Sequence, residues 1–514
     1  MKQKIYIEQA KIPIILLVCS ILFFAFYLYE KHTVASSFED IANLKVRSVD
    51  NAIILTWDKP AFQWGSRTEL TVHSSEGSDV IPLSQQRSSY TFKKGTHATM
   101  YTFSLQRTDA DGNAGQIQTG EGFFLDWDEL PELPVVSIET TNGILPSFTV
   151  ATAPEDCLGV SIRDNEYVGA QITVKDTVSV SCTGEIKIRG NTSASAGGRK
   201  LPYKIKLSDP KDLLVRGNDS YKHREWILLA NAYTLQTETG MITSQLCGMP
   251  WQPAYQPVNL FLNGNWQGCY LLVESVDAGQ TRIPVTDTGF IIEDDPYWWN
   301  ADGAYFKTSH QLDVMGYTYK YPSPTKITEE QIDSIAAYME AYESALMDDG
   351  EAFTNYIDVN PFASWILSHD VLGTWDAGGA NMYLSKIDLN PNDPFSSKLT
   401  LGPVWDFDTC FIQTDAWARM HSSHIQYFDV LFQKEAFVKA YKDTWYAISG
   451  SLSQSVNTQL ANYMDLYGAA LQESWELEAA RYGSNAGSIY DRHAFISHWF
   501  ETRIDWLNEA IGGM

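Results

Sequence analysis

The stretch Ile186 to Leu207 reads IKIRGNTSASAGGRKLPYKIKL, in which two runs of alternating apolar and basic residues flank a turn of small residues. An alternation of period two is typical of a strand with one buried face. The stretch therefore predicts a strand, a turn at residues 194–198 and a returning strand. Its six cations, with no acid among them, are Lys187, Arg189, Arg199, Lys200, Lys204 and Lys206. Backbone amides in such a turn can approach an anion closely, so we expect a phosphate site here; the alternative is an exposed basic hairpin.

Two carboxylates, Asp406 and Asp408, lie further along the chain in the stretch PVWDFD at residues 403–408. They follow a strand-like run, KLTL at residues 398–401, and bulky apolar residues flank them. Like charges this close are costly without a cation or a proton, and hard oxygen ligands are what Mg²⁺ requires. The stretch predicts a divalent cation site, and the alternative is a pair of surface acids on a turn.

Asp376 and Asn381 are five positions apart in a glycine-containing stretch. Protein kinases use this spacing to place a catalytic carboxylate and a metal-ligating amide on one loop. The alternative is a loop in which the two side chains cap turns around Gly378 and Gly379. The neighbouring His369 is expected to be a packed histidine, because no second histidine stands at metal-ligand spacing.

A further set of acids lies between these motifs: Glu274 near a hairpin, and Glu293, Asp294 and Asp295 after the strand-like run at residues 290–292. Any of them can pair with a lysine of the basic stretch, as a kinase glutamate orients its phosphate-binding lysine. The alternative is a set of solvated acids near strand ends.

The composition of the 514-residue chain restricts its partners. With 37 Lys and Arg against 63 Asp and Glu, the formal charge is −26, which disfavours binding to nucleic acid. Hydrophobic residues make up 44% and charged residues only 19%, so the chain is not intrinsically disordered. A basic partner suits it better than a nucleic acid.

Residues 12–29 form an apolar run of 18 residues without a charge, long enough to cross a bilayer. Lys2, Lys4 and Lys11 precede the run, so the positive-inside rule places residues 1–11 in the cytoplasm and the bulk of the chain outside. We expect an uncleaved single-pass signal anchor in the cell membrane. The alternative is a secreted protein, cleaved near the small residues at positions 33–35.

The cysteines show no C-x-x-C spacing, which argues against a zinc cluster. A disulfide between Cys157 and Cys182, which are 25 positions apart beyond the apolar run, is conceivable from spacing alone. Five exported cysteines cannot all pair.

The remaining chain divides into two regions with an acidic, proline-containing linker, DWDELPELP, at residues 126–134. Residues 40–125 alternate in short runs with turn signals and predict an all-β sandwich that resembles a fibronectin type III domain, with Trp57 in its core and Tyr101 as a corner tyrosine. Residues 135–514 begin with strand-like runs, including a hairpin at Asn263-Gly264, and turn helical after Thr328. The fold class is α+β.

Taken in chain order, the motifs of residues 135–500 resemble the CotH family of spore-coat-type atypical protein kinases. The motifs that carry the resemblance are RGNTS at 189–193, K-x-PYKIKL at 200–207, EWILLAN at 225–231, LNG-x-x-x-G-x-YLL-x-E at 262–274, YPSP at 321–324, D-x-x-x-x-N at 376–381 and WDFD at 405–408. An ordered match of this many motifs is specific where each one alone is not.

The resemblance implies a kinase-like domain with a β-rich N-lobe and a helical C-lobe, and the transfer of the γ-phosphoryl group of ATP to Ser or Thr of surface or coat proteins. It implies ATP with Mg²⁺ or Mn²⁺ as cofactors and a Ser/Thr-containing, Lys- or Arg-rich protein substrate. By the same resemblance, the residues with roles are Arg189, Gly190, Asn191, Thr192 and Ser193 in the nucleotide-facing loop, Lys204 or Lys206 as the phosphate-binding lysine, Glu274 as its orienting acid, Asp376 as the catalytic aspartate, and Asn381, Asp406 and Asp408 as metal ligands.

A second function class stays open on the sequence. An exported chain with a fibronectin-like domain and aromatic residues such as Trp298 and Trp299 also fits a catalytically inactive surface module that binds cell wall, carbohydrate or coat proteins. Nucleotide binding separates the two classes.

Overall fold

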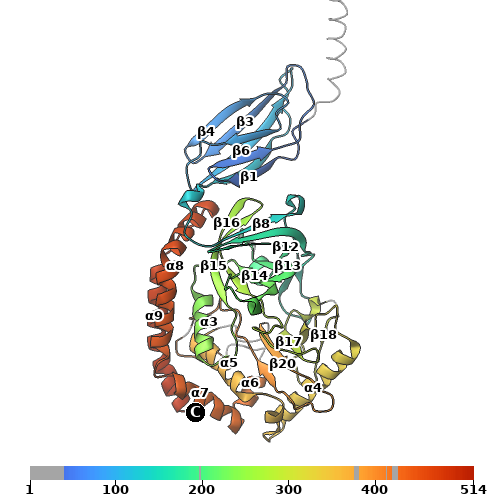
Figure 1. The fold of residues 1–514 in the computed structure, drawn as a ribbon, viewed down its shortest axis with the longest axis vertical. Helices are drawn as coiled ribbons and strands as arrows, with labels where there is room; N and C mark the ends of the chain where they lie inside the picture. Colours follow the sequence, from blue (N-terminus) through green and yellow to red (C-terminus); the bar gives the residue numbers. More distant parts are fainter. Residues whose placement is uncertain (1–39, 196–197, 302, 375–380, 413, 419–425) are drawn as a thin grey trace, which may run out of the picture. The chain divides into compact units, whose positions relative to one another are not determined.

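The computed structural model describes residues 40–514 apart from 196–197, 302, 375–380, 413 and 419–425. The chain divides into two compact units, residues 1–130 and 131–514 (Figure 1). The division falls within the expected linker at residues 126–134. The predicted span at residues 12–29 lies outside the described residues. Within the described part, no helix combines the length and the apolar character that a bilayer crossing requires.

The described part of the first unit is a sandwich of two antiparallel sheets in the orders β1-β2-β5 and β4-β3-β6-β7. Its strands are β1 (Lys45–Val49), β2 (Ala52–Thr56), β3 (Arg67–Ser74), β4 (Gly77–Leu83), β5 (Ser89–Phe92), β6 (Thr99–Thr108) and β7 (Gln118–Phe124). A short 3₁₀ helix, η1 (Trp127–Glu129), follows β7.

Two residues singled out in the sequence occupy the positions expected of them. Trp57 is 5% exposed and belongs to the sandwich core. The Tyr101 hydroxyl accepts a hydrogen bond from the backbone N–H of Thr96 at 3.0 Å, which is a tyrosine corner. The all-β sandwich expected from the alternation is confirmed, with the corner that fibronectin-like and immunoglobulin-like domains share.

The second unit begins with a closed barrel in the order β11-β12-β13-β14-β16-β15-β8. Neighbouring strands are antiparallel except for the parallel pair β15 and β8. The strands are β8 (Val135–Thr140), β11 (Val168–Lys175), β12 (Ser179–Ile188), β13 (Tyr203–Lys211), β14 (His223–Leu229), β15 (Tyr255–Leu262) and β16 (Asn265–Glu274). The hairpin turn between β15 and β16 is Asn263-Gly264, as predicted, and both residues have positive φ.

A second sheet follows in the order β18-β19-β17-β20-β21. Its strands are β17 (Phe290–Asp295), β18 (Tyr305–Phe306), β19 (Gly316–Tyr321), β20 (Met382–Lys386) and β21 (Leu399–Leu401). The remaining short elements of the unit are β9 (Thr149–Thr152), β10 (Val160–Arg163), η2 (Thr141–Gly143), α2 (Thr192–Ser195), η3 (Asp219–Tyr221), η4 (Trp298–Asn300) and η5 (Ala352–Asn355).

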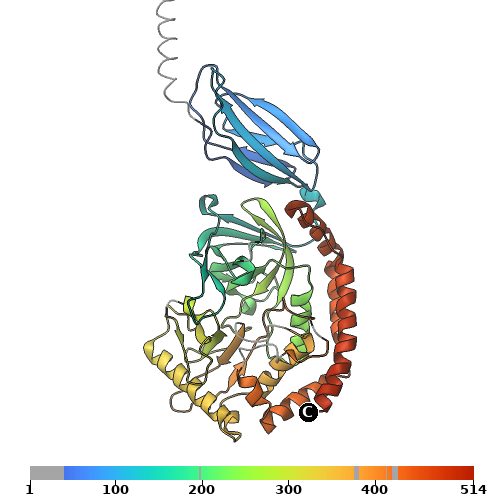
Figure 2. The same cartoon turned by 180° about the vertical axis from the view of Figure 1, so that it is seen from behind.

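Helices dominate the rest of the chain, as the spacing after Thr328 predicts. They are α4 (Glu329–Met347), α5 (Val359–Leu372), α6 (Gln426–Leu431), α7 (Glu435–Ile448), α8 (Leu452–Tyr482) and α9 (Ile489–Gly512), and α3 (Gln236–Leu246) precedes them between β14 and β15. Thr328 caps α4 through a reciprocal capping box with Gln331. In both views α8 and α9 run alongside the barrel and the helices beyond it (Figures 1 and 2). The coarse α+β fold, β-rich and then helical, is confirmed.

The five described cysteines are all free thiols, so the disulfide conceivable between Cys157 and Cys182 does not form. Cys182 is buried among the apolar residues of the barrel interior. His369 is 2% exposed in the helical core, and neither ring nitrogen has a hydrogen-bond partner among the described residues. It is a packed histidine, as expected, and burial lowers its pKa to about 3.

A buried ion pair joins the barrel to α8. The Lys200 ammonium lies 2.5 Å from a carboxylate oxygen of Glu478 and donates to the carbonyl of Cys269 at 2.6 Å. The same Glu478 oxygen accepts hydrogen bonds from the Tyr233 hydroxyl and from the Cys269 N–H. Gly268 makes this approach possible, because its φ is +112° and a Cβ there would lie 2.5 Å from Glu478.

A second buried acid, Glu238 on α3, keeps its proton up to about neutral pH. Its side chain is fully buried, and one oxygen accepts a hydrogen bond from Tyr463 at 3.0 Å, while the other has no hydrogen-bond partner within the described ranges. Burial raises the pKa of Glu238 to about 7. Because burial disfavours the charged carboxylate, the folded state is most stable while Glu238 is protonated.

We predict that Glu238→Gln stabilises the protein more at pH 8 than at pH 5. The unfolded chain loses the Glu238 proton near the ordinary glutamate pKa of 4.5 and the folded chain loses it near 7, so the wild type loses stability across that window. Glutamine has no proton to lose and still accepts from Tyr463. Urea titrations should give a pH-dependent gain of about 2 kcal/mol. An equal effect at both pH values would contradict a protonated Glu238.

Candidate functional site

The basic stretch lies on the outer face of the barrel. Ile186, Ile188 and Ile205 point into the barrel core, each at most 1% exposed. Because side chains alternate along a strand, the cations between these isoleucines face outward. Lys187 lies on β12, Arg189 directly follows its last residue, and Lys204 and Lys206 lie on β13. Four of the six cations singled out in the sequence therefore share one face, whereas Lys200 forms the buried ion pair with Glu478.

Acids of the neighbouring strands pair with the two candidate lysines on this face. Lys204 lies 2.7 Å from Glu225 of β14, and Lys206 lies 3.2 Å from Glu185 of β12. Lys187 is the register partner of Lys204, and burial together with the Lys204 charge lowers the pKa of Lys187. Glu225 thus takes the place beside a lysine that the sequence analysis assigned to Glu274.

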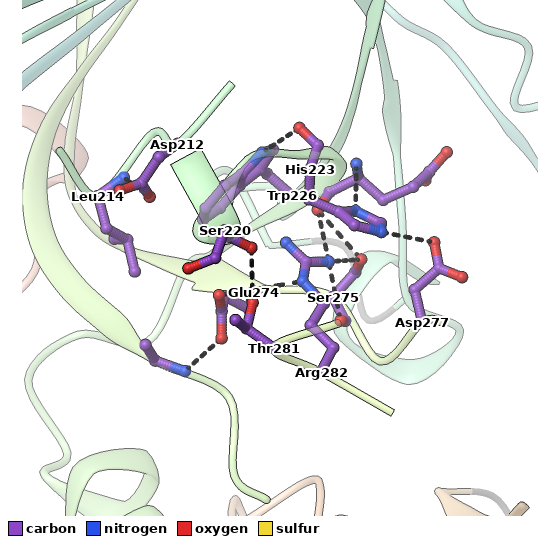
Figure 3. A network of polar contacts seen from close by, with 12 residues as sticks. Asp212, Leu214, Ser220, His223, Trp226, Glu274, Ser275, Asp277, Thr281 and Arg282 are labelled. Carbon is purple, nitrogen blue, oxygen red and sulfur yellow. Dashed lines mark hydrogen bonds and ion pairs between the residues drawn. The ribbon is translucent and has the colours of Figure 1, made fainter. Parts of the chain in front are cut away.

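The expected pairing of Glu274 with a lysine is wrong. Glu274 accepts a hydrogen bond from Arg216 at 2.9 Å and one from the Ala254 N–H at 3.1 Å. Its carboxylate also lies 3.9 Å from the guanidinium of Arg282 (Figure 3). Strand register explains the error. Glu274 pairs with Trp226, which faces the barrel interior, whereas Lys204 pairs with Ile227 on the opposite face.

The RGNTS loop is split between two environments. Gly190 has a φ of +81°, and a Cβ there would lie 2.2 Å from the Ser193 hydroxyl, so the turn requires glycine. Asn191 accepts a hydrogen bond from Ser161 of β10 at 2.8 Å. Thr192 and Ser193 are exposed. Arg189 leaves the loop on the outer face, where its guanidinium stacks 5.7 Å from the Trp405 ring.

Trp405 belongs to PVWDFD at residues 403–408, which we call the acidic stretch. Its contact with Arg189 therefore joins two motifs that are far apart in the sequence. The next residue, Asp406, is exposed and has a φ of +65°, a conformation that Asp and Asn tolerate better than most residues. Phe407 is 2% exposed, and Asp408 is exposed again. The alternation directs both carboxylates away from the core.

Gly240 on α3 allows Phe407 to lie where it does. A Cβ at Gly240 would lie 2.1 Å from a ring carbon of Phe407, so only glycine permits this packing. Gln236, one helical turn earlier, donates to the Asp408 carbonyl at 2.9 Å. The backbone of the acidic stretch is therefore held by α3.

Asn381 completes the cluster. Its side-chain amide nitrogen donates to Asp406 at 3.2 Å, which leaves the amide oxygen as the atom able to bind a cation. Its backbone N–H donates to Glu293 of β17 at 2.8 Å, and Glu293 forms an ion pair with Lys320 of β19. Two expected metal ligands, Asn381 and Asp406, are thus in contact.

Asp376 lies outside the described residues. The described residues on either side of its segment both lie near residues 403–410. The Thr374 hydroxyl is 3.7 Å from the Cys410 thiol, and Asn381 contacts Asp406. The acidic stretch and the ends of the predicted catalytic loop are therefore neighbours.

Lys320 is the functional candidate that sequence reasoning missed. Besides Glu293 it feels the charge of Asp295, and both acids raise its pKa against the effect of burial. Asp295, in turn, has its pKa raised to about 6 by burial and by Glu293. The charge of Arg189 opposes this rise in the pKa of Lys320, so Arg189 lies near the same group. The one available signal was the single lysine among aromatic residues in GYTYKY at 316–321.

The assembled site has cations on one side and oxygen donors on the other. Within the described ranges, no three His, Cys, Asp or Glu side chains form a ready metal cluster. The amide of Asn381 with the carboxylates of Asp406 and Asp408 is a set of hard oxygen donors that can hold a divalent cation of the Mg²⁺ class. The lysine and arginine side chains of the barrel face can bind anionic groups of a ligand that also binds the divalent cation.

A family model described as CotH kinase protein matches residues 186–507. No curated protein sequence matches the chain. Similar solved structures include the fn3 domain of human contactin 1 (12% identity, 18% of this chain and 80% of that one, TM-score 0.16) and a two-domain fibronectin type III segment of chicken tenascin (15%, 33% and 90%, 0.16). A third is the twitchin kinase region from C. elegans (11% identity, TM-score 0.17), covering 47% of this chain and 41% of that one.

We predict that Gly240→Ala displaces Phe407 and lowers stability by about 1–3 kcal/mol, because the added methyl group overpacks the contact. Gly450→Ala is the matched control, since a Cβ there meets no described atom within 4 Å. Thermal unfolding of both variants checks the prediction. Equal melting temperatures for the two variants would show that Phe407 is not held by α3.

Proposed function

Because the chain belongs to the CotH kinase protein family, we propose that it is an extracytoplasmic atypical protein kinase, anchored by residues 12–29, that transfers the γ-phosphoryl group of ATP to Ser or Thr. The observation that carries the proposal is the contact of Arg189, at the end of the basic face, with Trp405, which precedes Asp406; Asp406 in turn contacts Asn381. Phosphoryl transfer needs this combination of cations and metal-binding oxygens at one place.

We assign Lys204 rather than Lys206 to the phosphates. Lys204 has the shorter ion pair, 2.7 Å to Glu225 against 3.2 Å from Lys206 to Glu185, and its side chain is less exposed, 35% against 48%. A lysine oriented by a largely buried acid is better placed for a fixed contact than a solvated one. Glu225 is the orienting acid in this proposal, in place of Glu274.

Asn381 and Asp406, with Asp408 assisting, are proposed to hold Mg²⁺ or Mn²⁺. Bound with ATP, the cation would neutralise charge on the phosphates. Glu293, paired with Lys320, acts on the same site by fixing the Asn381 backbone. Asp376 is assigned by family resemblance as the base that accepts the proton of the substrate hydroxyl.

The net charge of −26 supports a basic substrate, since opposite charges favour encounter. We therefore propose Ser-containing, Lys- or Arg-rich surface or coat proteins as substrates. The chain would meet them outside the cell, on the side where the positive-inside rule places residues 40–514.

The direct test is transfer of labelled phosphate from ATP to a Ser-, Lys- and Arg-rich peptide, with Mn²⁺ and the full chain in lipid nanodiscs. We predict transfer by the wild type and a loss of at least about 100-fold for Asp406→Asn and for Asp376→Asn, because each removes charge that acts in the transition state. Asp349→Asn, at an exposed position outside the site, is the matched control.

Two results would count against the proposal. Transfer that persists in both site variants would mean that the activity does not come from these residues. Absence of both transfer and ATP binding in the folded wild type would favour the rival function, a surface module that keeps the fold without catalysis.

A further inference from the structure

The loop between β2 and β3 carries two large aromatic side chains into solvent. Trp64 is 69% exposed and Phe62 is 55% exposed, and their rings meet edge to face with centroids 6.2 Å apart. Burial of aromatic side chains is the dominant source of binding energy at many interfaces. An exposed aromatic pair at a loop tip therefore points to a partner.

The loop is built to hold these rings outward. Arg107, which is 1% exposed, donates to the Ala61 carbonyl and to the Ser66 hydroxyl, so it fastens the loop on both sides of the pair. Gly65 lies against Ala110 of the β6–β7 connection. A Cβ at Gly65 would lie 2.7 Å from the Ala110 Cβ, so no larger residue fits there. A rigid backing reduces the ordering cost when the rings are buried against a partner.

The described chain enters the sandwich beside this loop. The Asp58 N–H donates to the Ala42 carbonyl at 3.0 Å, and the Asn43 amide donates to the Asp58 carboxylate at 2.6 Å. Ten residues, 30–39, separate Asp40 from the end of the expected span at residue 29. Fully extended, ten residues reach no further than about 35 Å, so an anchored chain keeps the loop near the bilayer.

We propose that Phe62 and Trp64 contact the phospholipid headgroup region on the external surface of the cell membrane. This contact would orient the sandwich on that surface. The Trp64 ring suits that depth because its indole N–H is polar while the rest of the ring is apolar. The Phe62 ring adds apolar area beside it. Exposed Lys59, three residues before Phe62, suits the phosphates of the headgroups. This inference rests on the anchor proposed above and not on catalysis.

The test places a photo-crosslinker in the loop of the full chain. The full chain, with Phe62 replaced by p-benzoylphenylalanine, is reconstituted into phosphatidylcholine vesicles that contain a labelled lipid, and then irradiated. We expect lipid adducts at position 62 and at least a fivefold lower yield when Trp64→Ser is added. The same crosslinker at Val80, which is 59% exposed in the middle of β4 of the same sandwich, is the control and should give at least fivefold fewer adducts.

Each other outcome contradicts the proposal. Retention of the chain through an alkaline wash without adducts at position 62 would overturn the lipid contact alone. Crosslinks between two protein chains that fall as vesicles are diluted with lipid would identify a second copy as the occupant. Release of the chain by the alkaline wash would contradict both the membrane anchor at residues 12–29 and the lipid contact. It would not bear on catalysis, which the phosphate-transfer assay tests separately.

Discussion

The period-two alternation of β12 and β13 is the constraint on which the rest of the site depends. Closing the barrel buries Ile186, Ile188 and Ile205, and so it forces the cations between them onto the outer face. Because those cations need partners, Glu185 and Glu225 pair with the lysines, while Arg189 reaches Trp405 of the other half of the unit. A one-residue slip in register would turn every one of these charges into the core.

The opposite half of the site depends on a different kind of restraint. Phe407 is fixed in the core against Gly240, and this fixed residue presents the carboxylates on either side of it. Asn381 is held by its backbone through Glu293 and by its side chain through Asp406. Packing thus determines where the charges lie, and the charges determine what can bind.

Local features of the fold could be predicted from the sequence because they depend on near neighbours. The Asn263-Gly264 turn, the cap at Thr328 and the corner at Tyr101 all carry their own local signals. The role of Glu274 could not be predicted, because barrel closure decides which strand face meets which cation. Lys320 was missed for the same reason: its partners, Glu293 and Asp295, come from another strand.

The proposed function requires one ligand to contact both the barrel face and residues 403–408. Hydrogen exchange of the full chain in nanodiscs, with and without Mn²⁺ and ATP, tests this requirement. We predict slower exchange in residues 186–207 and also in residues 381–410 when the nucleotide and metal are both present. Protection confined to one of these segments, or to neither, would contradict a site shared between them.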